Sequence, residues 1–327
     1  MPIPRILLLL IAKSLRSFGS FIFRYLYERI YHMPLYHPAI TKSIPSTLSP
    51  FALPLIHLNF YYPPSYSFSS SALFPCILNF HGGGFTVGTP AEDSIWLRYC
   101  VEDLNCIVCS VDYRLAPEYP YPIPIQDGVD ALLYLRKHSE QLGIDPEKIA
   151  TSGFSAGGNL AVVVPILARD ILDERAKKEG KAGDEWGIKA VMTWYPGLDR
   201  TVTGKEKVAR MANPHKAMPM IVATFFDHSY IPRNIDRTES YLSPAVAGDE
   251  VLKRGLPDKI AIWTCENDML CEEARAFAER LGKLGKNVRY GMVEGVAHGW
   301  DKFPGALPKP EAVYEEACGF LREVFKE

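Results

Sequence analysis

The stretch Lys148–Val164, KIATSGFSAGGNLAVVV, predicts a strand ending at Ser152, a sharp turn that raises Ser155, and a helix that begins directly after the turn. Its centre, Gly153–Gly157, fits the pattern G-x-S-x-G. Such a turn needs tiny residues two positions before and after the serine, because a side chain there would collide with the adjoining strand or helix. The free N–H groups of the new helix would face any negative charge that develops beside the serine. An ordinary tight turn between a strand and a helix fits the same pattern, so the rest of the chain must decide.

Composition points to a globular enzyme. The 327 residues are 47% hydrophobic and 23% charged, which suits one large α/β domain with a subdomain, or at most two domains. The formal net charge of -2, with both signs mixed along the chain, gives no electrostatic footprint for nucleic acid.

The seven cysteines show no disulfide framework. Cys106 and Cys109 lie in a strand-like run, where residues three apart face opposite sides, so neither a shared metal nor a disulfide is expected. The cysteines favour a reducing compartment, and we expect a cytoplasmic protein.

The N-terminus contains a strongly apolar run, Ile6–Ala12. The run is about seven residues long, whereas roughly twenty are needed to span a bilayer. From Ile6 to Ile30 apolar residues recur at helical spacing with basic residues between them, which predicts an amphipathic helix. That helix would either cover a pocket or rest on a membrane surface through residues 1–30. The protein is therefore expected to be cytoplasmic with a peripheral membrane contact left open.

Strand and helix patterns alternate from Pro75 to the end of the chain, which predicts a mostly parallel, doubly wound sheet. Residues 31–75 are expected to form an edge hairpin. We divide the chain into N-terminal cap helices over 1–50, a first core part over 51–199, a cap insertion over 200–240, and a second core part over 241–327. The insertion is rich in Met, Phe and Tyr.

A glycine-rich segment, His81–Phe85, follows the buried strand Pro75–Phe80. Three consecutive glycines allow backbone N–H groups to point at a ligand rather than pair with neighbouring strands. A flexible turn is the alternative explanation.

A serine nucleophile needs a base to accept its proton, and the base needs an acid to orient it. His298 follows the last predicted strand and Asp268 follows the preceding one, so the order Ser155, Asp268, His298 is that of an α/β-hydrolase. The N–H groups of Ala156, Gly83 and Gly84 would bind the oxyanion. His298 could instead be a loop residue. Asp268 could cap the next helix, and Glu266 and Glu272 compete with it for the acid's place.

Three motifs, His81–Phe85, Asp112–Glu118 and Gly153–Asn159, together resemble the hormone-sensitive-lipase family of carboxylesterases. The resemblance covers roughly residues 70 to 327. It implies the α/β-hydrolase fold with a mostly parallel eight-stranded doubly wound sheet and a mobile helical cap. It also implies the triad Ser155, Asp268 and His298, the oxyanion hole of Gly83, Gly84 and Ala156, no cofactor and no metal. Phe154 stands where that family usually has Asp, and Met269 where it usually has Pro.

We therefore expect a serine carboxylic-ester hydrolase that forms an acyl-enzyme. Its substrate would be a small hydrophobic ester with a short or medium acyl group, bound by Phe85, Phe154, Met218 and Phe225. An acyltransferase of specialised metabolism could use the same triad. A non-catalytic small-molecule receptor on this scaffold is disfavoured by His298. The sequence gives no oligomeric state.

Overall fold

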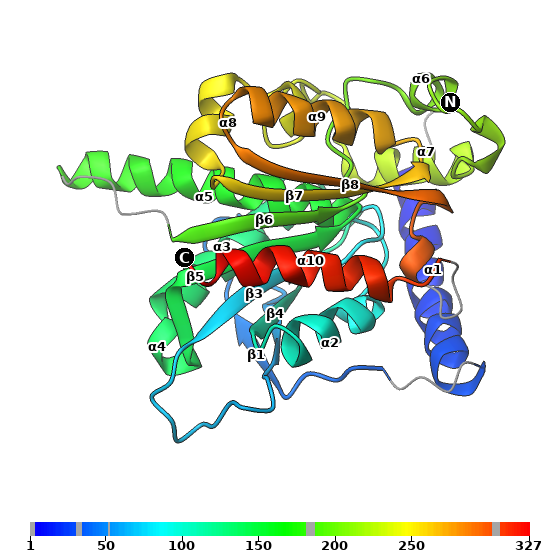
Figure 1. Cartoon of the computed structure of the whole chain (residues 1–327). Coiled ribbons are helices and arrows are strands. Elements are labelled where there is room, and N and C mark those ends of the chain that lie inside the picture. The colour runs from blue at the N-terminus through cyan, green and yellow to red at the C-terminus, as the bar shows by residue number, and fades with distance from the viewer. Residues whose placement is uncertain (1–3, 31–34, 52, 181–186, 303–307) are drawn as a thin grey trace.

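One eight-stranded sheet organises the molecule, with the strand order β1-β2-β4-β3-β5-β6-β7-β8 (Figure 1). A computed structural model describes residues 4–30, 35–51, 53–180, 187–302 and 308–327. Strands β1 and β2 form an antiparallel hairpin, β2 pairs antiparallel with β4, and all later pairings are parallel. The predicted sheet and its edge hairpin are confirmed. The strands are β1 Ile40–Ile44, β2 Ile56–Tyr61, β3 Phe74–Phe80, β4 Ile107–Asp112, β5 Ile144–Phe154, β6 Ile188–Trp194, β7 Lys259–Asn267 and β8 Asn287–Ala297.

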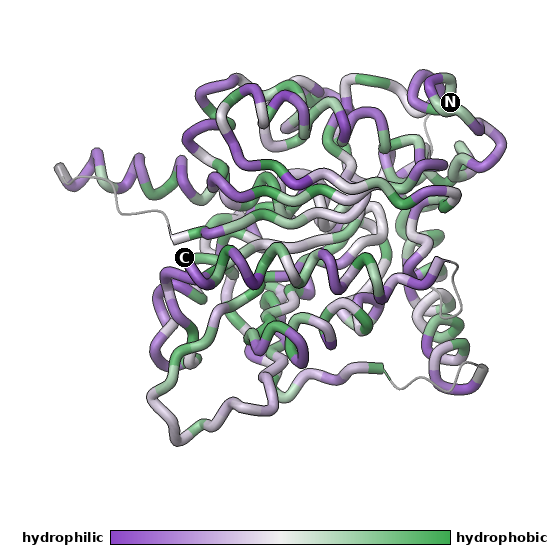
Figure 2. Tube along the Cα trace, viewed as in Figure 1, coloured by the Kyte–Doolittle hydropathy of each residue, from purple (hydrophilic) through white to green (hydrophobic). Residues whose placement is uncertain are grey.

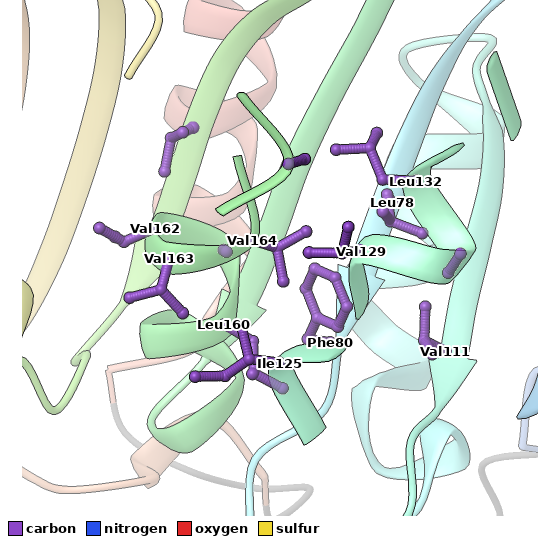
Figure 3. Packing of buried hydrophobic residues seen from close by; sticks show 14 of the residues in the cluster. Leu78, Phe80, Val111, Ile125, Val129, Leu132, Leu160, Val162, Val163 and Val164 are labelled. Carbon is purple, nitrogen blue, oxygen red and sulfur yellow. The ribbon is translucent and has the colours of Figure 1, made fainter. Parts of the chain in front are cut away.

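Helices cover both faces of the sheet, so its central strands are buried on both sides. On β3, Leu78 and Phe80 enter the core beneath α3 and α5, while Ile77 enters a second core beneath α2 and α10. Figure 3 shows Phe80 packed among residues of α3 and α5, including Val129 and Val164. The helices are α1 Arg5–Tyr25, α2 Ser94–Glu102, α3 Ile123–Lys137, α4 Ser139–Leu142, α5 Ala156–Glu179, α6 Gly204–Ala209, α7 Met220–Tyr230, α8 Asp249–Gly255, α9 Cys271–Lys283 and α10 Glu311–Val324.

Three helices, α1, α6 and α7, lie past the carboxyl ends of the parallel strands (Figure 1). Helices α6 and α7 come from the predicted insertion 200–240, and α1 packs on α7 through Leu8, Ala12 and Phe225. The two ends of the predicted cap therefore meet in space. The division of the chain into core and cap remains a prediction.

Helix α1 continues through a π-helical turn, Leu26–Ile30, and its exposed side is unusually apolar. The segment Arg5–Arg29 is long and apolar enough to cross a membrane by length and composition, and an 18-residue window within it has a mean hydropathy of 1.8. The apolar segment is therefore longer than the seven-residue run Ile6–Ala12 indicates, because apolar residues continue along the whole helix. Figure 2 shows hydrophobic positions recurring along α1.

Candidate active site

The serine turn joins the end of β5 to the start of α5. Ser155 has φ 54° and ψ −112°, a backbone conformation that residues other than glycine rarely adopt. A Cβ on Gly153 would lie 2.1 Å from the Gly157 carbonyl oxygen, and a Cβ on Gly157 would lie 2.0 Å from that of Phe80. Both positions therefore require glycine, as the sequence pattern predicts, and the crowding lifts Ser155 out of the strand.

Ser155, His298 and Asp268 lie within one chain of hydrogen bonds at the carboxyl ends of β5, β7 and β8. His298 Nε2 is 2.8 Å from Ser155 Oγ, and His298 Nδ1 is 2.6 Å from Asp268 Oδ2. The other carboxylate oxygen of Asp268 accepts a hydrogen bond from the Leu270 N–H at 3.0 Å, which fixes the carboxyl plane. Asp268 thus both braces the turn into α9 and faces the imidazole. Glu266 is exposed and binds the Gly295 N–H instead.

The surroundings of His298 favour its protonated form. Burial opposes the charge, but the Asp268 carboxylate, its hydrogen bond and the carboxylate of Asp301 outweigh burial, so the pKa of His298 is raised above its usual value. The ring of Tyr195 lies edge-on to the imidazole, with 4.8 Å between centroids. The Tyr195 hydroxyl donates a hydrogen bond to Asp301. Tyr195 therefore contacts the imidazole through its ring and holds the Asp301 carboxylate, whose charge favours the imidazolium.

The glycine-rich loop lies directly beside the serine. A Cβ on Gly82 would be 3.7 Å from Ser155 Cβ, and Gly83 and Gly84 have φ values of 106° and 58°. Across the described chain, no acceptor bonds the N–H of Gly83, Gly84 or Ala156. All three residues line the cavity that contains Ser155 and His298. The structure therefore brings the predicted oxyanion donors and the predicted triad to one place.

The cavity has a volume of 740 Å³ and is bounded on its outer side by the 200–240 segment. Phe85 and Met218 line it as predicted, with Phe85 stacked on Tyr230 at 3.7 Å between centroids. Phe225 requires a correction: it packs against α1 and is not among the lining residues, whereas Phe226 is. Phe226 lies directly over the glycine loop, since a Cβ on Gly84 would approach its ring to 2.3 Å.

Several charges in the outer wall are paired with charges of opposite sign, while Lys205, which also lines the cavity, is exposed. Arg200 Nη1 is 3.2 Å from Asp227, and the buried ammonium of Lys207 contacts the buried carboxylate of Glu273. The remaining outer wall is largely apolar, contributed by Val202, Met218, Met220, Ala223, Phe226, Met269 and Leu270.

Phe154 lies next to the serine, but its ring is fully buried. The Lys302 ammonium stands 3.1 Å from the ring centroid and also pairs with Asp93 at 2.7 Å and Asp301 at 3.4 Å. Phe154 is among the lining residues of the cavity, as Lys302 is, and the cation lies over the ring that was predicted to form an aromatic wall. The nearby Glu92 also lines the cavity; burial and the Asp93 carboxylate raise the pKa of Glu92 to about 7, against the effect of Lys302.

Sequence reasoning did not identify several residues that border the site: Glu92, Arg200, Phe226, Asp301 and Lys302. Lys302 follows His298 within the same turn of chain, and this proximity was the available signal for it. The position of Phe226 depends on the rotation of α7, which nearly continuous apolar residues leave undetermined.

Several known proteins of similar sequence and structure are ester hydrolases. A family model described as alpha/beta hydrolase fold matches residues 77–302. Esterase LipI of Mycobacterium tuberculosis is 41% identical over 264 residues, which cover 81% of this chain and 77% of that protein. The arylesterase of Saccharolobus solfataricus is 30% identical over 253 residues, covering 76% and 75%. The crystal structure of EstE1, a thermophilic carboxylesterase cloned from a metagenomic library, matches with a TM-score of 0.76 at 25% identity and covers 96% of this chain and 97% of its own.

Proposed function

Because the chain belongs to the hormone-sensitive-lipase-like carboxylesterases of the α/β-hydrolase fold, we propose that it is a serine esterase whose nucleophile is Ser155. The hydrogen-bonded chain from Ser155 through His298 to Asp268 carries the proposal. A serine hydroxyl becomes nucleophilic at neutral pH when a neutral imidazole accepts its proton. His298 Nε2 is at the right distance for this transfer, and Asp268 stabilises the imidazolium that results.

In the first half of the reaction, Ser155 Oγ attacks the ester carbonyl carbon while its proton passes to His298 Nε2. The carbonyl oxygen becomes an oxyanion, for which the N–H groups of Gly83, Gly84 and Ala156 are the donors. Collapse of this intermediate breaks the bond to the alcohol, which leaves with the proton from His298. Water then attacks the acyl-enzyme by the same route and releases the acid, so Ser155 and His298 return to their starting states.

The proposed substrate is a hydrophobic ester with a short or medium acyl group. The volume of 740 Å³ lies within the range of small-molecule sites. The mostly apolar wall supports a hydrophobic substrate, and the pairing of Arg200 with Asp227 leaves its charge compensated. A clear preference for charged esters would contradict this proposal.

The test is hydrolysis of p-nitrophenyl esters, from acetyl to palmitoyl, by the wild-type chain and by Ser155→Ala. We expect turnover to be highest for esters with short or medium acyl chains. In Ser155→Ala we expect kcat to fall about 10⁴-fold or more. Ser152→Ala is a matched control, since its hydroxyl accepts a hydrogen bond from Trp96 and does not face the site. A folded wild-type chain without turnover would refute hydrolysis; addition of alcohol acceptors would then test acyl transfer.

A further inference from the structure

Helix α1 presents its more apolar side to solvent. Its outer face, defined here by Ile6, Leu10, Phe18, Phe21 and Tyr25, has these side chains between 51% and 71% exposed. Leu7, Leu15 and Ile22 extend the same surface. Single exposed apolar residues are ordinary, but a continuous apolar face of this size marks an interaction site.

The charges of the helix indicate what that site binds. Residues 5–27 contain four basic residues and no acidic residue. Lys13 and Arg24 are exposed and lie about three helical turns apart, so they follow one edge of the outer face; Arg24 also pairs with Glu28 at 3.1 Å, one turn further along. An apolar face bordered by basic residues is the pattern of helices that lie in the interface of anionic membranes. We propose that the outer face of α1 docks on the surface of an anionic lipid bilayer, with the helix parallel to the membrane.

The inner side of α1 is held by the enzyme, which distinguishes lying on a bilayer from spanning it. Arg16 donates hydrogen bonds to Glu118 at 3.0 and 2.9 Å and to the Thr86 carbonyl at 2.7 Å. At the far end, the Tyr27 hydroxyl donates to the Lys302 carbonyl at 3.0 Å. A spanning helix would have to break all these contacts and would leave Phe225, which packs on Leu8 and Ala12, uncovered. A docked helix keeps them.

The docked helix is a direct neighbour of the cavity wall. Helix α7 packs on α1 and also lines the cavity, and its Ile221 is 80% exposed. Esters dissolved in the bilayer would then reach Ser155 past α7. This delivery of substrate rests on the proposed esterase function, whereas the docking itself does not.

The experiment is co-sedimentation of the full-length protein, carrying Ser155→Ala so that binding is measured apart from hydrolysis. The vesicles contain phosphatidylcholine alone or with phosphatidylserine. We expect binding to the anionic vesicles that weakens with salt, and a loss of about tenfold or more in the partition coefficient for the double variant Phe18→Ser/Phe21→Ser. The matched control is Phe68→Ser/Leu73→Ser, which removes two exposed apolar side chains far from α1 and should bind as the parent does.

Several results would overturn the proposal. Binding to anionic vesicles could be absent, or the partition coefficient could fall equally in both double variants. Binding could also resist extraction with alkaline carbonate, as expected of a spanning helix. Finally, the intact mass of the purified protein could show that α1 has been cleaved off. A dimer in solution that only Phe18→Ser/Phe21→Ser dissociates would make a second copy the occupant. Circular dichroism checks folding, and Lys13→Glu, which leaves the apolar face intact, should weaken anionic binding independently. Unchanged binding of Lys13→Glu would contradict the electrostatic part.

Discussion

His298 connects the electrostatics of the site to its pH dependence. Catalysis needs the neutral imidazole, while Asp268 and Asp301 stabilise the charged one and so raise the pKa of His298 above its usual value. Activity should therefore be absent at low pH and appear as pH rises through that raised pKa. Activity rises with pH because His298 acts as a base only after it has lost its proton.

We expect Asp268→Asn to move the acid limb of kcat/KM to lower pH, because the carboxylate that stabilises the imidazolium is gone. The same change should lower kcat by about 10⁴-fold, since the histidine loses its oriented tautomer. The measurement is the pH profile of p-nitrophenyl ester hydrolysis. Glu266→Gln is the matched control, because Glu266 is a carboxylate near the same strand end that bonds Gly295 and not His298. An acid limb that moves in both variants would contradict the assignment.

Phe154 and Lys302 form the second residue-level feature. The ring of Phe154 contacts the Lys302 ammonium and stacks on Trp194, and the ammonium keeps its ion pairs with Asp93 and Asp301 when the ring is removed, so Phe154→Leu tests these ring contacts. We expect the free energy of unfolding to fall by about 1–2 kcal/mol beyond the packing effect. The measurement is urea unfolding. Phe277→Leu, at a fully buried phenylalanine of α9, gives the packing effect alone; an equal loss in both variants would argue against the contact.

Two neighbouring residues of helix α7, Phe225 and Phe226, have different roles. Phe226 lies over Gly84 in the cavity, and Phe225 packs on Leu8 and Ala12 of α1. The helix thus joins the substrate wall to the N-terminal helix, so a substitution on one side should affect specificity and on the other side stability.

Phe226→Ala should shift the preferred acyl chain toward longer or bulkier groups, because the ring limits space above the glycine loop. Phe225→Ala should leave that preference unchanged and lower the free energy of unfolding by roughly 3 kcal/mol through lost packing. Ester-series kinetics and urea unfolding of both variants separate the effects. The same shift in preference from both substitutions would show that α7 moves as a unit rather than presenting two distinct faces.

At the scale of the elements, the local parts of the site were predictable and the long-range parts were not. The serine turn follows from the pattern of Gly153 and Gly157, although only the crowding at Gly153 is local; a Cβ on Gly157 would meet the Phe80 carbonyl oxygen of β3. The order of strands predicted that Asp268 and His298 lie at the same sheet edge. The contact of Arg16 with Glu118 joins distant segments and leaves no periodic signal. The face of α7 that meets the cavity was equally hidden, and Phe225 was predicted in place of Phe226.

The whole molecule sequesters its thiols. All seven cysteines are free and buried; six belong to the two hydrophobic cores, Cys271 begins α9, and none is among the lining residues of the cavity. Burial raises the thiol pKa of every one: Cys76, Cys100, Cys106, Cys109, Cys265, Cys271 and Cys318. Thiolate is the reactive form, so the folded chain should resist thiol reagents.

We expect 5,5′-dithiobis(2-nitrobenzoate) to label almost no thiol in the native protein at neutral pH and all seven in guanidinium chloride. Absorbance of the released thiolate gives the count. The denatured count is the control, because fewer than seven would reveal disulfides. Rapid labelling of one native thiol would contradict the buried position of that cysteine.

The positions of the catalytic side chains along the chain also bear on synthesis. Ser155 is synthesised about midway along the chain, whereas its base, His298, lies in the loop that follows β8. Among the described strands, β8 pairs only with β7. A ribosome-bound chain lacking β8 also lacks His298, so the Ser155 hydroxyl it carries is not activated. Ester cleavage therefore reports the docking of the last strand, and a chain divided between β7 and β8 would regain activity only when its two fragments reassemble.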